Sequence, residues 1–243
     1  MIRKFFKCVG LSFFSICLFN NDLLRDYFSS NMTDKSIIDS IFFVEDIGEI
    51  KIGMFFLSMI RPMVFAFYYG MFFYNNVTLS GIYGFIRYCS RRKWYFEKVI
   101  HVSFFALSFS IVSSFFLYFF TYGFLFIFDI HILKVFCLYT YLSFVYCMKG
   151  VLICNMLIIC LGSALGYAMF IIFLSIEVII SFMVKAVEST VCSLMSSWDI
   201  YRLFYAELSF KECLFDSCTV GIILLLFYYL IKKCDMGLIN KDA

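Results

Sequence analysis

The stretch Val102–Phe120 reads VSFFALSFSIVSSFFLYFF, and it contains no charged residue. Serine supplies its polar content, and the rest is aromatic or aliphatic. About 20 such residues in helical form are enough to cross the hydrocarbon core of a bilayer. A strand of a transmembrane barrel would instead alternate apolar and polar residues over about ten positions. The stretch therefore predicts a membrane-spanning helix.

The composition of the whole chain agrees with this local signal. Of its 243 residues, 63% are hydrophobic and 15% are charged, whereas soluble domains carry about 25% charged residues. Phe occurs 35 times and Pro once. Lipid tails solvate such side chains directly, and lipid requires every backbone polar group to be satisfied within a helix or a closed barrel. We therefore expect an all-α, polytopic transmembrane helical bundle whose main partner is the lipid bilayer. The net charge of +3 is too small to indicate nucleic acid.

Apolar runs separated by polar segments predict one transmembrane domain over residues 1–243 with about six spans. The expected spans are about 5–20, 52–74, 99–120, 149–166, 167–185 and 217–231. The polar segments 20–50 and 186–216 are expected to lie outside the cell.

The fourth and fifth spans come from the apolar run Val151–Val184, which is too long for one span and barely long enough for two. We expect a helical hairpin that turns near Gly162 and Gly166, with Lys134–Met148 as an external or re-entrant segment. In the other reading, Ile132–Cys147 is the fourth span and residues 151–184 form one long, tilted fifth span. Both readings give six spans.

The distribution of Lys and Arg predicts the orientation of the chain. Segment 75–98 contains five basic residues, while the external segments 20–50 and 186–216 contain two each. Basic residues accumulate in the short cytoplasmic connections of membrane proteins. We therefore expect a multi-pass protein of the plasma membrane with both termini in the cytoplasm, which agrees with an even number of spans.

Sequence motifs of enzymes and cofactor sites are absent. The chain has no Gly-x-x-x-x-Gly-Lys-Ser/Thr nucleotide-binding loop, no His-Glu-x-x-His and no Gly-x-Ser-x-Gly. It has two His, and none of its 11 Cys forms a Cys-x-x-Cys pair. We therefore expect no catalytic residue, no metal site and no cofactor bound by this chain.

The segment 79–98 carries the clearest functional signal. Ser80, Gly84, Arg87 and Arg91 follow one another at helical spacing, and apolar side chains lie on the other side. This pattern predicts an amphipathic helix at the membrane surface. We interpret its basic residues and the adjacent aromatic residue as a docking site for a cytoplasmic partner. The docking residues are Arg87, Arg91, Arg92, Lys93 and Trp94. The alternative is ordinary charge that fixes the topology.

This segment resembles the permease subunits of type-2 ATP-binding-cassette (ABC) exporters, in their bacteriocin- and lantibiotic-immunity-like branch. The matching residues are Gly81-Ile82-Tyr83, then Arg87-Tyr88-Cys89-Ser90-Arg91-Arg92-Lys93-Trp94, then Lys98 at the next span. The similarity covers the whole chain in layout and about 20 residues in motif. It implies that this helix couples the permease to a separately encoded ABC ATPase subunit, so that ATP acts only through that partner. It also implies a second permease copy or a paralogue.

The resemblance implies export of a hydrophobic or peptide cargo, with immunity to an antimicrobial peptide as one such role. A non-transporting membrane protein, for immunity or assembly, that binds a toxin or another membrane protein is the alternative function. We single out Arg61 and Glu177 because they are charges inside predicted spans. Such charges usually face a cavity or a partner, so we treat the two as a candidate intramembrane polar pair.

Overall fold

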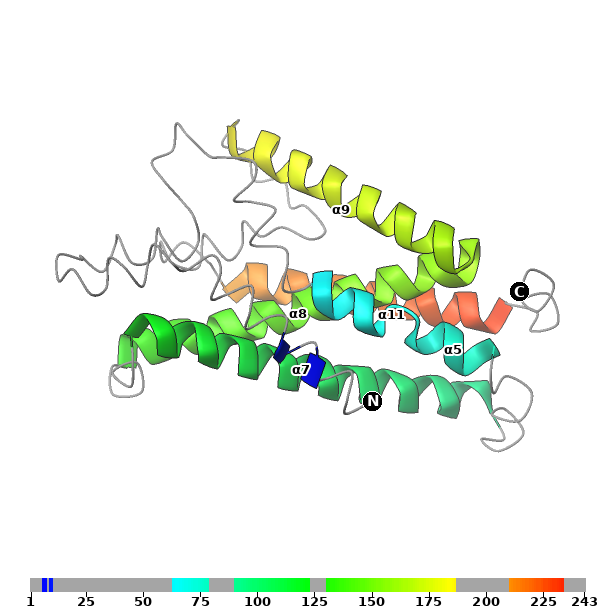
Figure 1. Ribbon diagram of the computed structural model, residues 1–243, viewed down its shortest axis with the longest axis horizontal. Helices are drawn as coiled ribbons and strands as arrows, with labels where there is room; N and C mark the ends of the chain where they lie inside the picture. Colours follow the sequence, from blue (N-terminus) through cyan, green and yellow to red (C-terminus); the bar gives the residue numbers. More distant parts are fainter. Residues whose placement is uncertain are drawn as a thin grey trace.

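The computed structural model describes residues 6–7, 9–10, 63–78, 90–122, 130–186 and 210–233. The elements in these residues are helices (Figure 1), and the described ranges contain no strand. The all-α class is therefore confirmed for this part of the chain. The helices are α5 (Phe72–Thr78), α7 (Arg91–Tyr122), α8 (Ile130–Leu161), α9 (Ser163–Ala186) and α11 (Phe210–Lys233), with a further helical stretch at residues 63–69.

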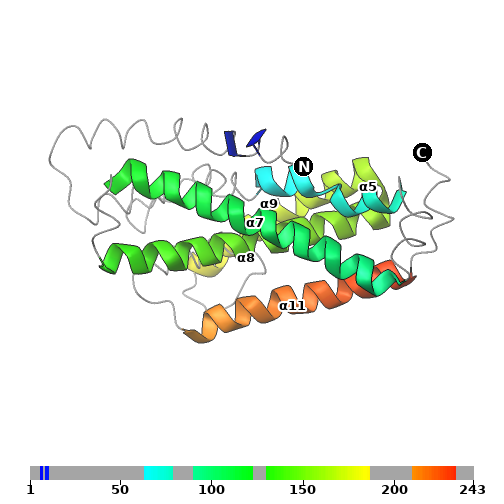
Figure 2. The same ribbon diagram turned by 90° about the horizontal axis from the view of Figure 1, so that it is seen from below.

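Helix α8 is the centre of the bundle. It packs against α5, α7, α9 and α11, and 67% of its most apolar part is buried, compared with 33% for α7 and 22% for α11. In Figure 1, α8 and α11 run in one direction and α7 and α9 in the other. Figure 2 also places the start of α7 and the end of α11 at the same end of the bundle. The connections from α7 to α8 and from α8 to α9 are short, as is usual between antiparallel neighbours in an up-and-down bundle.

Three of the described helices are long and apolar enough to cross a membrane. They are Arg91–Phe116, Phe136–Leu161 and Leu214–Lys233, and Ser163–Ile176 is a shorter apolar helix. Phe104, Leu107 and Ile111 form an exposed apolar stripe along α7, at the spacing of one helix face. Such a stripe suits contact with lipid tails. The predicted span 5–20 lies mostly outside the described residues, and of the predicted span 52–74 the structure describes residues 63–74.

The helix boundaries around the fourth predicted span differ from those expected. Helix α8 begins at Ile130 and continues without a break to Leu161, so Lys134–Met148 is part of one long helix. The fourth predicted span, about 149–166, begins at the charged residue Lys149. In the structure, this charge is buried and paired within the bundle, so the helix passes through it.

The turn between α8 and α9 lies at Gly162. Its φ angle is +84°, a left-handed conformation that glycine adopts at little cost, and its N–H donates to Ile158 O at 2.9 Å. One turn later, Gly166 lies against the backbone of Ile158, where an added Cβ would come within 2.5 Å of Ile158 Cα. The two glycines thus allow the chain to reverse and let the two helices approach closely.

A second break, at Gly70–Met71, separates residues 63–69 from α5. The buried side chain of Asn155 bridges this break. Its Oδ1 accepts the N–H of Phe73 at 3.0 Å, and its Nδ2 donates to Tyr69 O at 3.0 Å and to Val151 O at 2.8 Å. Buried backbone groups at a break in a helix need hydrogen-bond partners, and here one side-chain amide supplies them.

Candidate functional site

One end of the bundle carries a cluster of basic residues from two helices far apart in sequence, which we call the basic end. Its members are Arg91, Arg92, Lys93, Lys232 and Lys233. Their side chains are exposed, and Arg91 Nη1 donates to Lys232 O at 3.0 Å. The turn between α8 and α9 lies at this end too (Figure 1).

The helix dipole has opposite effects on the two halves of the basic end. Cations near the C-terminus of α11 are favourable, whereas cations in the first turn of α7 oppose the partial positive charge there. That first turn contains three basic residues and no acidic residue. These charges are therefore not explained by the stability of α7.

The structure places Trp94 inside the bundle and not on its surface. The indole is 1% exposed and lies edge-on to Phe73, with ring centroids 6.2 Å apart. Tyr95, its neighbour, packs on Phe227 and donates its hydroxyl to Leu224 O at 2.7 Å. Of the predicted docking residues, Arg91, Arg92 and Lys93 are thus exposed, and Trp94 is buried against α5 beneath them.

The start of α7 also differs from the predicted boundary between a surface helix at 79–98 and a span at 99–120. Ser90 precedes the helix, and its Oγ accepts the N–H of Lys93 at 3.2 Å, as an N-cap does. Residues 91–98 are therefore the first part of α7. Arg87 and the rest of the predicted surface helix lie outside the described residues.

The predicted pair of Arg61 and Glu177 stays a prediction. Arg61 lies outside the described residues, and for Glu177 the structure describes only the backbone, within α9.

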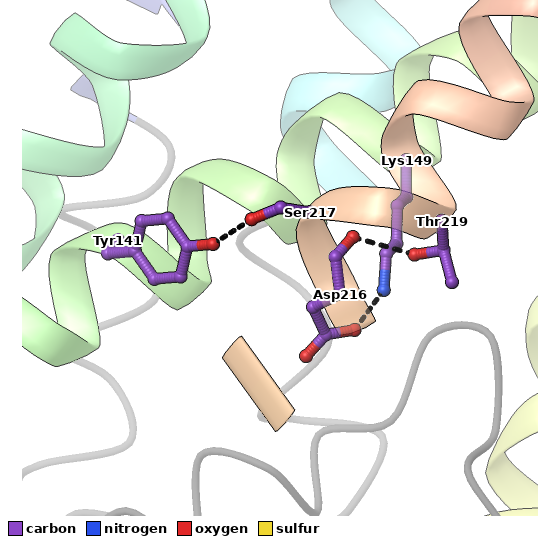
Figure 3. Close-up of polar contacts among 5 residues, drawn as sticks. All are labelled: Tyr141, Lys149, Asp216, Ser217 and Thr219. Carbon is purple, nitrogen blue, oxygen red and sulfur yellow. Dashed lines mark hydrogen bonds and ion pairs between the residues drawn. The ribbon is translucent and has the colours of Figure 1, made fainter. Parts of the chain in front are cut away.

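An ion pair that the sequence analysis did not anticipate lies within the bundle (Figure 3). Lys149 Nζ on α8 pairs with Asp216 Oδ1 on α11, and the two side chains are 4% and 11% exposed. Thr219 Oγ1 donates to Asp216 O at 2.7 Å on one side of the pair. The hydroxyls of Tyr141 and Ser217 are hydrogen-bonded to each other on the other side. Polar groups of two helices therefore meet inside the bundle.

Lys149 lies midway along the candidate span Phe136–Leu161, and Asp216 lies two residues after the start of the candidate span Leu214–Lys233. At about 1.5 Å per residue, Asp216 is roughly 24 Å from Lys232 along α11. With Lys232 near one boundary of a hydrocarbon core of about 30 Å, the pair lies within the core, closer to the opposite boundary. Buried charges at such depth are costly and usually serve a function or pair with each other, as these two do.

The pair is not expected from the sequence because of where the predicted spans begin and end. Lys149 stood at the start of the fourth predicted span and Asp216 at the end of an external segment, and both places are expected to contact water. The one available signal was the apolar sequence on both sides of Lys149. Apolar sequence on both sides is compatible with a charge inside a helix and with a charge at the end of a helix.

The two regions differ in what they offer chemically. The ion pair is neutral overall and closed off by α8 and α11, so it is suited to fixing one helix against another. The basic end is open and is suited to binding an acidic surface. In the described part of the chain, no three His, Cys, Asp or Glu side chains are grouped as a metal site requires. Comparison of the chain with family models, curated proteins and solved structures finds no match in any of the three.

Proposed function

We propose that this chain is the membrane-spanning permease subunit of an ABC-type transporter, with a separate ATPase subunit that binds the basic end. The observation that carries the proposal is the exposed cluster of Arg91, Arg92 and Lys93, held beside Lys232 and Lys233 by the Arg91–Lys232 hydrogen bond. In this proposal the chain is not an enzyme, and ATP is bound and hydrolysed by the partner alone.

The proposal has two supports besides the motif around residues 81–98. The three positive charges lie in the first turn of α7, where the helix dipole disfavours them. We therefore expect that they have a role other than stabilising α7, either in fixing the topology or in binding a partner. The next two residues of α7 are buried and make aromatic contacts, Trp94 with Phe73 and Tyr95 with Phe227. A push on the basic end would therefore be transmitted directly to α5 and α11.

The proposed assembly places six spans in the plasma membrane with both termini in the cytoplasm. Residues 5–20 and 52–74 supply the first two spans, and α7, α8, α9 and α11 supply the other four. A second copy or a paralogue completes the transporter, and the cargo is a hydrophobic or peptide molecule, such as an antimicrobial peptide that the cell must expel.

The test is co-purification in mild detergent from the cell that produces the chain, with identification of an ATPase that contains a nucleotide-binding loop. The double variant Arg92→Glu/Lys93→Glu should lose this ATPase and the ATP-dependent efflux of cargo. Arg91 is left unchanged because it holds Lys232. The matched control is Lys134→Glu, an exposed lysine on α8 near the opposite end of the bundle, which should retain both.

If the chain purifies without any ATPase, and the double variant protects cells from a toxin as well as the original chain does, the transporter proposal is wrong. The non-transporting immunity or assembly protein then becomes the better explanation.

A further inference from the structure

Two cations of the basic end lie over aromatic rings that face outward from the bundle. The guanidinium carbon of Arg92 is 5.7 Å from the centroid of the Phe96 ring, and Nζ of Lys233 is 4.8 Å from the centroid of the Tyr229 ring. Each ring lies one helical turn further into the bundle than its cation, and Phe96 and Tyr229 are 50% and 54% exposed. A ring attracts a cation without neutralising its charge. Both charges therefore stay available to an anion.

The two cations lie at the ends of candidate spans. Arg92 is the second residue of the span Arg91–Phe116, and Lys233 is the last residue of the span Leu214–Lys233. Basic and aromatic side chains at the end of a span are typical of the level at which lipid headgroups lie. The phosphate groups of the bilayer are therefore expected beside these two residues.

Exposed apolar side chains continue from each ring along the span. On α7, Ile100 and Phe104 are 66% and 64% exposed. On α11, Leu225 and Ile222 are 70% and 57% exposed. These residues follow the rings at intervals of three or four positions, so they lie on the same helix faces as the rings. Each helix thus presents a cation, a ring and an apolar face in the order in which a phospholipid presents its phosphate, its glycerol and its acyl chains.

The charge of the basic end selects among lipids. The hydrogen bond from Arg91 Nη1 to Lys232 O joins its two halves at one end of the bundle (Figure 2). Within the described ranges, neither Arg92 nor Lys233 has a carboxylate partner. Basic residues clustered at a membrane surface attract anionic lipids. A zwitterionic lipid carries a cation of its own, and a second copy of the chain docked through the same face would bring further positive charges.

We propose that Arg92 and Lys233 bind the phosphate groups of anionic phospholipids, whose acyl chains lie along the exposed apolar faces of α7 and α11. Arg92 supplies a planar guanidinium that can donate two N–H groups to one phosphate, and Lys233 supplies an ammonium. The inference goes beyond the proposed function, because it requires no ATPase.

The experiment compares phosphatidylglycerol with phosphatidylcholine of the same acyl chains on the purified chain in detergent. Native mass spectrometry measures how much of each lipid stays bound. Phosphatidylglycerol should bind more tightly, by roughly fivefold for each basic residue that attracts it. Equal retention of the two lipids would overturn the proposal without any variant. Displacement of phosphatidylglycerol by inorganic phosphate would also overturn it, because the site would then take free anions and not a lipid.

Two exposed lysines provide a matched pair of variants. Lys233→Gln and Lys134→Gln each remove one positive charge, but Lys134 lies on α8 near the opposite end of the bundle. Lys233→Gln should lower the affinity for phosphatidylglycerol roughly fivefold, and Arg92→Gln/Lys233→Gln roughly 25-fold. Lys134→Gln should leave the affinity unchanged. Equal losses in Lys134→Gln and Lys233→Gln would show that total charge alone sets the affinity, which contradicts the proposal.

The main competing occupant of this face is a second copy of the chain. Dimers that retain no phosphatidylglycerol, beside monomers that retain it no better than phosphatidylcholine, would overturn the proposal. None of these measurements contains an ATPase. A failure of lipid binding therefore leaves the proposed function untouched, and the absence of an ATPase in the co-purification test leaves the lipid site untouched.

Discussion

The basic end and the Lys149–Asp216 pair are two charged regions in the described part of the bundle, and they are built in opposite ways. At the basic end, like charges from α7 and α11 are gathered on the surface, where water screens them. In the interior, one positive and one negative charge are paired between α8 and α11 with little exposure. The comparison indicates that the buried pair determines how the helices are held together, whereas the basic end serves interactions outside the chain.

The largest effect is expected from removing one member of the buried pair. Lys149→Met leaves Asp216 with an uncompensated charge, and Asp216→Leu does the same to Lys149, so each should lower the free energy of unfolding by about 3–5 kcal/mol. The double variant Lys149→Met/Asp216→Leu should recover most of this loss, because it buries no charge. Unfolding in mixed micelles measures all three. A double variant as unstable as the single variants would show that the pair does not hold α8 to α11.

The second largest loss of stability is expected at Asn155, whose side chain hydrogen-bonds the backbone on both sides of the break at Gly70–Met71. Asn155→Leu leaves the N–H of Phe73 and the carbonyl of Tyr69 without their bridge, and each buried unsatisfied group costs about 1–3 kcal/mol. Asn76→Ala is the control, since Asn76 Nδ2 donates to the Phe72 carbonyl of its own helix and does not bridge the break. Thermal unfolding in detergent should show a clear loss for Asn155→Leu and a small one for the control. Equal losses would mean that the bridge is not needed.

A smaller effect is expected at the α8–α9 hairpin. Gly166→Ala places a methyl group against the backbone of Ile158, and overpacking of this kind costs about 1–3 kcal/mol. Gly221→Ala on α11 meets no atom within 4 Å, so it should be neutral or should stabilise the helix by about 0.5–1 kcal/mol. The same unfolding assay compares the two. If Gly166→Ala is as stable as Gly221→Ala, the close approach of α9 to α8 is not required.

The comparison also shows what sequence reasoning predicts well here. Long apolar runs predicted helices, because only a helix or a closed barrel satisfies the backbone in lipid. The positions of Lys149, Asp216 and Trp94 could not be predicted in the same way. A charge at the edge of an apolar run has the same sequence pattern whether it contacts water or pairs with another helix. An aromatic residue beside a basic cluster also has the same pattern at an interface and in a core.

The smallest effect on stability, and the sharpest contrast, is expected at the basic end. Arg92→Glu/Lys93→Glu changes exposed side chains, so the free energy of unfolding should change by no more than about 0.5 kcal/mol. The sign should favour the variant, because acidic residues suit the first turn of α7. Partner binding should nevertheless be lost.

A variant that both binds its partner normally and is less stable would reverse the roles assigned to the two regions, since the basic end would then hold the bundle together. Unfolding in micelles and co-purification, measured on the same preparation, separate these outcomes.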